Sequence, residues 1–184
     1  MKKYLMLFGG LFLGYFLISD IYIQVTKDKT PGKAKRLACQ QNVTTFEKSY
    51  NDEKVKIAQT LIKAGNYEFT STIEKSKYAT SKLFNYISKE QTDKIFQDEL
   101  KSYITVKNSE GKKLNLKYNI YENDIKDPGK KTEKSKLYAG YVWLEVKDEN
   151  NFVIYKVQID FMDKEGKDIT QSIKCCIKSL ITYN

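Results

Sequence analysis

The side chains that could do chemistry in this chain are carboxylates, amines and thiols, because the sequence contains no histidine. Histidine is the commonest general base near neutral pH and the commonest zinc ligand. Its absence excludes Ser-His-Asp and Cys-His catalytic arrangements. Two carboxylate pairs, Glu122/Asp124 and Asp148/Glu149, fall in segments that we predict to be loops without sign of burial. We therefore predict that the protein is not an enzyme and has no catalytic residues.

The glycines form no recognisable ligand loop. Neither GxGxxG nor GxxxxGK[ST], the two phosphate-binding patterns, occurs in the sequence. Residues 163–166, Asp-Lys-Glu-Gly, resemble a calcium loop, but their glycine is fourth where an EF-hand needs it sixth. We interpret this segment as a turn, and we predict no metal and no cofactor.

The three cysteines are Cys39, in a basic segment, and the adjacent Cys175 and Cys176. We predict a last strand over residues 169–181, which places Cys175 on its buried face and Cys176 on its polar face. Because strand neighbours point to opposite sides, a bond between the adjacent cysteines would be strained. A disulfide between Cys39 and Cys176 is therefore the candidate pairing in an oxidising compartment. The alternative is three free thiols, with Cys175 as a small core residue.

The charge pattern argues against nucleic-acid binding. Of the 32 basic residues, 31 are lysine. Residues 1–41 hold seven basic and two acidic residues, so this segment carries +5 of the formal net charge of +9. Proteins that recognise specific nucleic-acid sequences depend on arginine for bidentate contacts to bases and phosphates. Here the lysines are scattered among 23 acidic residues. We expect a solvated lysine- and glutamate-rich surface and no nucleic-acid partner.

An apolar run over residues 4–25 follows Met-Lys-Lys and predicts a membrane segment. At ~1.5 Å per residue the run is about 33 Å long, enough to cross a bilayer core of ~30 Å. Its densest part, residues 5–18, would also suit a secretory signal peptide, but no pair of small residues for cleavage follows it closely. We predict an uncleaved anchor over residues 1–26, and cleavage remains the alternative.

Gly10 and Gly14 form a GxxxG step within this run. Such a step allows a second helix to pack closely, so we predict self-association or partner packing there. The alternative is that both glycines are neutral, because such pairs are common by chance.

Two arguments on orientation conflict. Five basic residues at positions 27–36 follow the run and two precede it, which by the positive-inside rule would keep the following domain in the cytoplasm. A short basic N-terminus before an apolar stretch is instead typical of export, and long domains cross with little regard to charge. We predict a single-pass protein of a bacterial inner membrane whose soluble domain lies in the periplasm.

The rest of the chain predicts a basic linker over residues 27–41 and one soluble domain over residues 42–184, about the size of an ordinary domain. Helical spacing of apolar residues predicts amphipathic helices over residues 42–64 and 73–87. Ser88 and Gln91 resemble a capping box, which predicts a third helix. Residues 67–71 alternate briefly and are either an edge strand or an extended link.

After residue 102 the period of the apolar pattern changes to two, which predicts strands. We expect them at residues 103–106, 114–120, 142–146, 153–161 and 169–181. On the third of these Val142 and Leu144 face inward, although Tyr141 and Trp143 make its other side apolar too. The sequence therefore predicts an α+β domain in which a helical block packs on a curved antiparallel sheet.

This order of elements resembles the NTF2/cystatin-like cone, in which helices lie across a bent antiparallel sheet. The resemblance covers most of residues 42–184 and depends on element order, not on a motif. An anchor, a linker and such a domain are also similar to the bitopic scaffold subunits of bacterial secretion systems and to flagellar-motor accessory proteins. The similarity implies a noncatalytic scaffold or accessory subunit of the cell envelope, with other envelope proteins as partners. The alternative is a periplasmic small-ligand-binding module, or a weak enzyme, that uses the concave face of the sheet.

Overall fold

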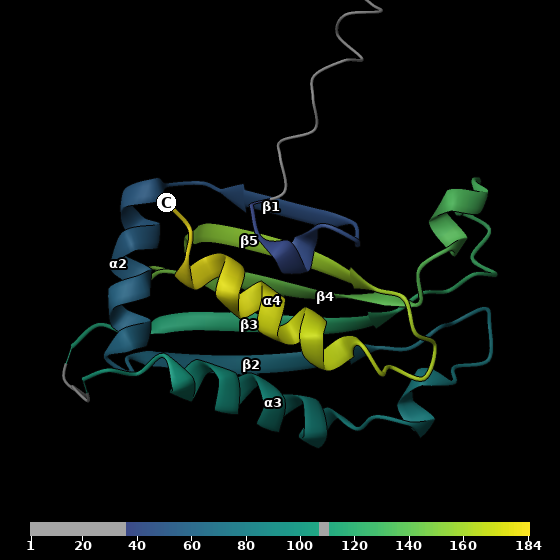
Figure 1. Cartoon of the computed structure of the whole chain (residues 1–184), viewed down its shortest axis with the longest axis horizontal. Coiled ribbons are helices and arrows are strands. Elements are labelled where there is room, and N and C mark those ends of the chain that lie inside the picture. The colour runs from purple at the N-terminus through teal and green to yellow at the C-terminus, as the bar shows by residue number, and fades with distance from the viewer. Residues whose placement is uncertain (1–35, 107–110) are drawn as a thin grey trace, which may run out of the picture. The chain divides into compact units, whose positions relative to one another are not determined.

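The structure, a computed structural model, describes residues 36–106 and 111–184. The predicted anchor, including Gly10 and Gly14, lies outside these residues. Among the described residues, no helix combines the length and the apolar character needed to cross a bilayer. The predicted α+β class is confirmed, since the described part of the chain has three α-helices and one five-stranded sheet (Figure 1). In chain order the elements are η1 (Ala38–Gln40), β1 (Thr45–Ser49), α2 (Asp52–Lys63), β2 (Tyr67–Glu74), η2 (Leu83–Asn85), α3 (Lys89–Ser102), β3 (Leu114–Glu122), η3 (Glu133–Lys136), β4 (Gly140–Lys147), β5 (Val153–Phe161) and α4 (Ile169–Ile181).

The sheet has the strand order β1-β5-β4-β3-β2, so β1 and β2 are its two edges. Neighbouring strands are antiparallel except β2 and β3, which run parallel. The parallel pair follows from the connection, because β2 reaches β3 through α3 and a crossover is what parallel strands require. Successive antiparallel strands were predicted, and this is confirmed for β3, β4 and β5.

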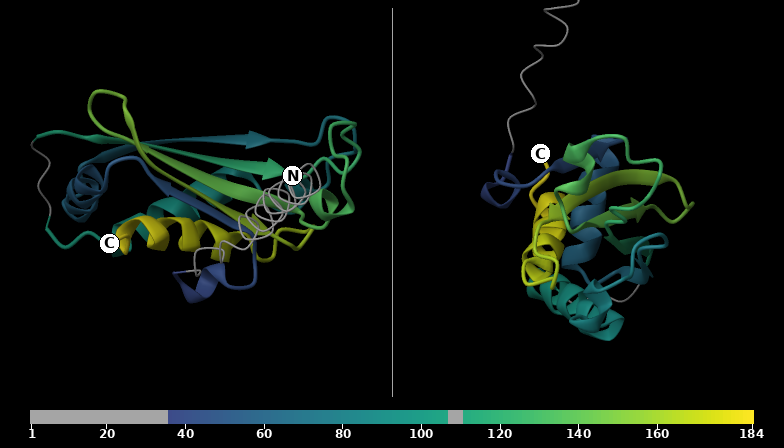
Figure 2. Two further views of the ribbon diagram at one scale, coloured as in Figure 1. Left: turned by 90° about the horizontal axis from the view of Figure 1, so that it is seen from above. Right: turned by 90° about the vertical axis from the view of Figure 1, so that its right-hand side faces the viewer.

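The hydrophobic core lies between one face of the sheet and the helices (Figure 2). Strand side chains that face the helices stand directly opposite one another, as in the row formed by Tyr118 on β3, Leu144 on β4 and Val157 on β5. All three are at most 1% exposed. In Figure 1, α4 lies across the middle of the sheet, α3 lies beside β2, and α2 crosses one end of the strands.

The segment predicted as the last strand is helix α4, so that prediction was wrong. Its isoleucines recur every fourth residue, which fits one face of a helix as well as one face of a strand. The helix buries Ile169, Ile173 and Ile177 together with residues three positions away, such as Ser172 and Cys176. This combination of spacings is helical.

The first half of the domain also differs from the prediction. Residues 42–64 were expected to be one helix but form β1 and then α2, whose first turn is capped by the Asn51 side chain. Residues 73–87 contain the end of β2, a loop and η2, and residues 103–106 form no strand. The capping box of Ser88 and Gln91 is confirmed, since each side chain accepts a hydrogen bond from the backbone N–H of the other. Residues 67–71 belong to an edge strand.

Candidate functional site

The helices cover one face of the sheet, and we call the opposite side the open face (Figure 2). Strand register aligns one row of its side chains across four strands: Asn119 on β3, Trp143 on β4, Gln158 on β5 and Phe46 on β1. These residues alternate with the core residues, so the same strands supply both faces. The open face is therefore a surface that the helices leave available for contact with another molecule.

The aromatic side chains of the open face are the ones that can bury area against a partner. Phe46 is 63% exposed, and Trp143 is half-buried. The Nζ of Lys156 lies 5.4 Å from the centroid of the Trp143 ring, a cation–π distance. Phe46 falls in the segment predicted to be a helix, residues 42–64, whereas the apolar second side of β4 did indicate Trp143 and Tyr141.

A shallow hollow of about 300 Å³ opens beside Trp143, between β2, β3, β4 and β5. At its floor Asn119 is only 6% exposed. The Thr72 hydroxyl donates to the Asn119 side-chain oxygen (2.9 Å), and the Asn119 amide donates to Glu74 Oε1 (2.7 Å). The hollow thus offers an aromatic wall and an amide already held by two neighbours on β2.

Glu145, a buried carboxylate of the open face, is paired with two lysines. Lys156 Nζ lies 2.8 Å from Oε2 and Lys147 Nζ lies 3.4 Å from Oε1. Burial raises the pKa of Glu145, but the hydrogen bond from Lys156 and the charges of both lysines outweigh it, so the net pKa is lowered. Glu145 is therefore ionised at neutral pH and holds the two lysines over the sheet.

Where β3 ends and β4 begins, the rings of Tyr121 and Tyr141 stack on the open face with centroids 4.7 Å apart. The Nζ of Lys130 lies 5.3 Å from the centroids of both Tyr121 and Tyr138. Burial, with a smaller contribution from the nearby Glu74 carboxylate, raises the pKa of Tyr141 to about 12. Its hydroxyl therefore stays protonated at neutral pH.

The structure corrects the prediction that the loop carboxylates are unburied. Glu122, the last residue of β3, is 8% exposed and Asp124 is 4% exposed. Glu122 Oε1 accepts the backbone N–H groups of Lys82 (2.8 Å) and Leu83 (2.9 Å), and its Oε2 accepts that of Ser76 (3.2 Å). This carboxylate holds both ends of the loop between β2 and η2.

Asp124 holds the middle of the same loop by accepting the backbone N–H groups of residues 77, 78 and 79 at 2.6–3.0 Å. Burial raises the pKa of Asp124, but the backbone hydrogen bonds lower it by more, so the net pKa is depressed. Asp148 is also buried, and it accepts the N–H groups of Asn150 and Phe152 and a bond from Lys54. Glu149 is exposed and pairs with Lys112. These carboxylates order loops.

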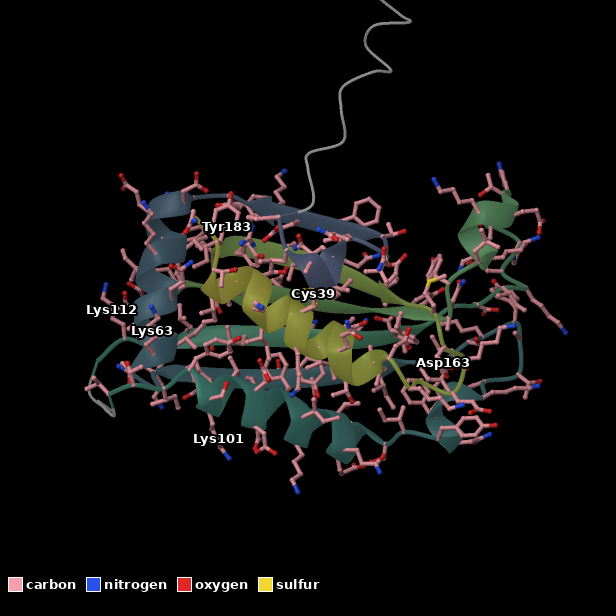
Figure 3. The ribbon with its side chains drawn as sticks, viewed as in Figure 1. Cys39, Lys63, Lys101, Lys112, Asp163 and Tyr183 are labelled. Atoms are coloured by element: carbon pink, nitrogen blue, oxygen red, sulfur yellow. A yellow bond between two sulfur atoms is a disulfide. The ribbon has the colours of Figure 1, made fainter. Side chains whose placement is uncertain are left out.

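The disulfide joins Cys39 to Cys175, so the predicted pairing of Cys39 with Cys176 was wrong (Figure 3). In a helix the two adjacent cysteines point about 100° apart, not to opposite sides. Cys175 meets η1, while Cys176 faces the sheet, where its sulfur lies 3.6 Å from the Val142 carbonyl oxygen. Cys176 is fully buried, and burial raises the pKa of its thiol, so this group is poorly suited to nucleophilic chemistry.

One further expected feature has a structural counterpart. Residues 163–166 form the predicted turn, in which the Gly166 N–H donates to the Asp163 carbonyl oxygen (3.0 Å) and Gly166 has φ of +75°. Among residues 36–106 and 111–184, no three His, Cys, Asp or Glu side chains lie close enough together to hold a metal ion.

Comparison with known proteins identifies no relative. No family model, no curated protein and no solved structure matches this chain.

Proposed function

We propose that the chain is a noncatalytic, membrane-anchored scaffold or accessory subunit of a bacterial cell-envelope assembly, of the secretion-system or flagellar-motor type. The observation that carries the proposal is the open face, where the exposed Phe46 and the half-buried Trp143 lie in one row with polar neighbours. Aromatic residues surrounded by polar ones are typical of protein–protein interfaces. Other envelope proteins are the partners that such a surface would contact.

The carboxylates support a noncatalytic role. A general acid or base needs a group that can exchange a proton with a substrate. Glu122 and Asp124 instead accept three backbone N–H groups each, and their lowered pKa values keep them ionised. Glu122 and Asp124 therefore order the loop between β2 and η2.

The periplasmic location rests on the sequence and on one bond. The Cys39–Cys175 disulfide supports an oxidising compartment, because such bonds are rare in the cytosol of most organisms. The anchor over residues 1–26 is proposed from its length and apolar character. The likeness to the NTF2/cystatin-like cone also belongs to this proposal. Helices on one face of a sheet support the likeness, while the parallel β2–β3 pair and the C-terminal helix α4 depart from the expected order of elements.

The second candidate is a periplasmic small-ligand-binding module. The hollow of about 300 Å³ beside Trp143 favours it, because an aromatic wall and convergent polar groups are what a small ligand needs. The exposed Phe46 lies outside that hollow and favours a protein partner instead.

The test is an affinity pull-down of the tagged full-length protein from gently solubilised membranes. A double variant, Phe46→Ser with Trp143→Ala, removes the aromatic part of the open face. The matched control is Ile57→Ser with Tyr78→Ala, because both side chains are about 60% exposed on other elements. Partners should be lost with the first variant and retained with the control. Retention of the same partners by the open-face variant would overturn the proposal, and loss of binding to a small molecule alone would favour the second candidate.

A further inference from the structure

Strand β1 is an edge of the sheet that residues 36–106 and 111–184 form, and on its outer side Thr45 and Ser49 pair with no other strand of that sheet. The Asp160 N–H donates to the Thr44 carbonyl oxygen, and the Tyr50 N–H donates to the Ile154 carbonyl oxygen (3.0 Å each). Even-numbered residues of β1 therefore exchange hydrogen bonds with β5. In antiparallel pairing the residues between them direct N–H and C=O to the other side. The backbone groups of Thr45 and Ser49 thus point out of the sheet.

The same two residues carry the unsatisfied hydroxyls of this edge. Thr45 Oγ1 and Ser49 Oγ are buried on the helix side of β1 and have no hydrogen-bond partner among the residues that the structure describes. Buried hydroxyls without a partner are uncommon, because most buried polar atoms are paired. On the open-face side of β1, Phe46 is 63% exposed, so a large apolar side chain is left in contact with water. The opposite edge differs, because α3 lies beside β2 (Figure 1).

We infer that β1 of one copy pairs antiparallel with β1 of a second copy, joining two five-stranded sheets into one of ten strands. A two-fold axis at Glu47 places Thr45 of each copy opposite Ser49 of the other. Each of these pairs exchanges two backbone hydrogen bonds. A turn about χ1 brings the hydroxyls of Thr45 and Ser49 together, and cross-strand Thr–Ser bonds are a favourable pairing. In this register each hydroxyl without a partner in one copy meets one in the other copy.

The side chains beside these pairs are compatible with the dimer. On the open face the axis places Phe46 of one copy opposite Lys48 of the other, so the lysine stem lies beside the ring and leaves its outer face accessible. On the helix side the axis places the Glu47 carboxylates of the two copies opposite each other, a like-charge pair that costs stability. Each carboxylate accepts hydrogen bonds from Gln40 and from the Tyr155 hydroxyl of its own chain, which hold it in place. Prolines and bulges commonly protect a sheet edge, but β1 contains no proline and pairs with β5 without a bulge. The open faces of the two copies become one continuous surface.

Cysteine pairs test the register in membranes that contain the full-length protein. Opposed residues of a hydrogen-bonded antiparallel pair have Cα atoms ~5.5 Å apart, within the range of a disulfide. Coexpressed Thr45→Cys and Ser49→Cys chains should therefore cross-link under mild oxidation. Each variant alone should not, because like positions are separated by four residues along the strand, ~13 Å. The matched control on the other edge is Thr70→Cys coexpressed with Thr72→Cys, and it should give no cross-link.

An absent cross-link in the mixed pair, or an equal yield from Thr45→Cys alone, would overturn the inference. A second measurement separates this contact from association through the anchor. Thr45→Pro removes an outward N–H and no bond to β5, so the dimer dissociation constant in detergent should rise at least tenfold by sedimentation. An unchanged constant with a folded domain would also contradict the β1 pairing. If this variant does not fold, the cysteine pairs alone decide.

Discussion

Replacing Glu122 with glutamine should destabilise the domain by about 3 kcal/mol while leaving its shape unchanged. Two backbone N–H groups bond to Oε1 and one bonds to Oε2. Hydrogen bonds to a charged group contribute about 1.5–3 kcal/mol and neutral ones about 1. The amide keeps an oxygen for one side of the site, at reduced strength. On the other side it places an NH₂ group against an N–H donor. The weakened pair and the lost bond together give the expected value, a large part of a typical stability of about 5–15 kcal/mol.

The pH dependence identifies the charge as the cause. Burial raises the pKa of Glu122, but hydrogen bonds from the Leu83 N–H, the Ser81 hydroxyl and two further N–H groups lower it more, so the folded pKa lies below the unfolded value. A depressed carboxylate pKa gives stability that is present above the unfolded pKa of about 4.3 and is lost as the pH falls through the folded pKa. The difference between wild type and Glu122→Gln should therefore be constant near pH 7 and shrink below about pH 4.

Urea unfolding followed by fluorescence measures this difference, since Trp143 is the only tryptophan of the chain. The control is Glu133→Gln, because the Glu133 side chain is 88% exposed and pairs with Lys136 one turn away. Exposed pairs of this kind contribute at most about 1 kcal/mol. A loss below about 1 kcal/mol for Glu122→Gln, or a difference that persists unchanged in acid, would refute the role assigned to this carboxylate.

The remaining predictions concern the disulfide and one glycine. Trypsin should leave Cys175 and Cys176 on one peptide, so the mass spectrometry must be non-reducing and must include fragmentation of that peptide. We expect Cys39 bonded to Cys175 and an alkylatable Cys176, and a bond from Cys39 to Cys176 would contradict the structure. Cys175→Ser should lower the unfolding free energy by up to about 5 kcal/mol, from the entropy of a loop spanning a sequence separation of 136, whereas Cys176→Ala should keep the bond and lose less. Gly140→Ala should cost about 3 kcal/mol, because its Cβ would lie 2.1 Å from the Tyr121 carbonyl oxygen, and a thermal melt that matches wild type would contradict this.

The sequence predicts the elements whose apolar period is unambiguous. Strands β3, β4 and β5 alternate over eight or nine residues, and α3 has both a capping box and an apolar face. Helix α4 was missed because isoleucines four positions apart satisfy both periods, and their β-branched side chains favour a strand. The signal for a helix was Leu180, which is buried three residues beyond Ile177.

The candidate site was predictable only in part. The apolar second side of β4 marks Trp143 in the sequence, but Phe46 joins it through pairing between β1 and β5, residues more than 100 positions apart. The burial of Glu122 likewise depends on a loop some 40 residues earlier in the chain, whose N–H groups it accepts. Local patterns do not reveal such partners, because an acidic residue at a strand end is usually solvated.

The disulfide determines how the domain bears mechanical load. Without it, tension on the N-terminal segment would reach β1 first and detach it from β5 one residue pair at a time. With Cys39 bonded to Cys175, a force between the two termini passes from η1 directly into α4 and the C-terminal residues. The chain between the two cysteines, including all five strands, is then bypassed. The sheet can therefore stay intact while the ends of the chain are pulled.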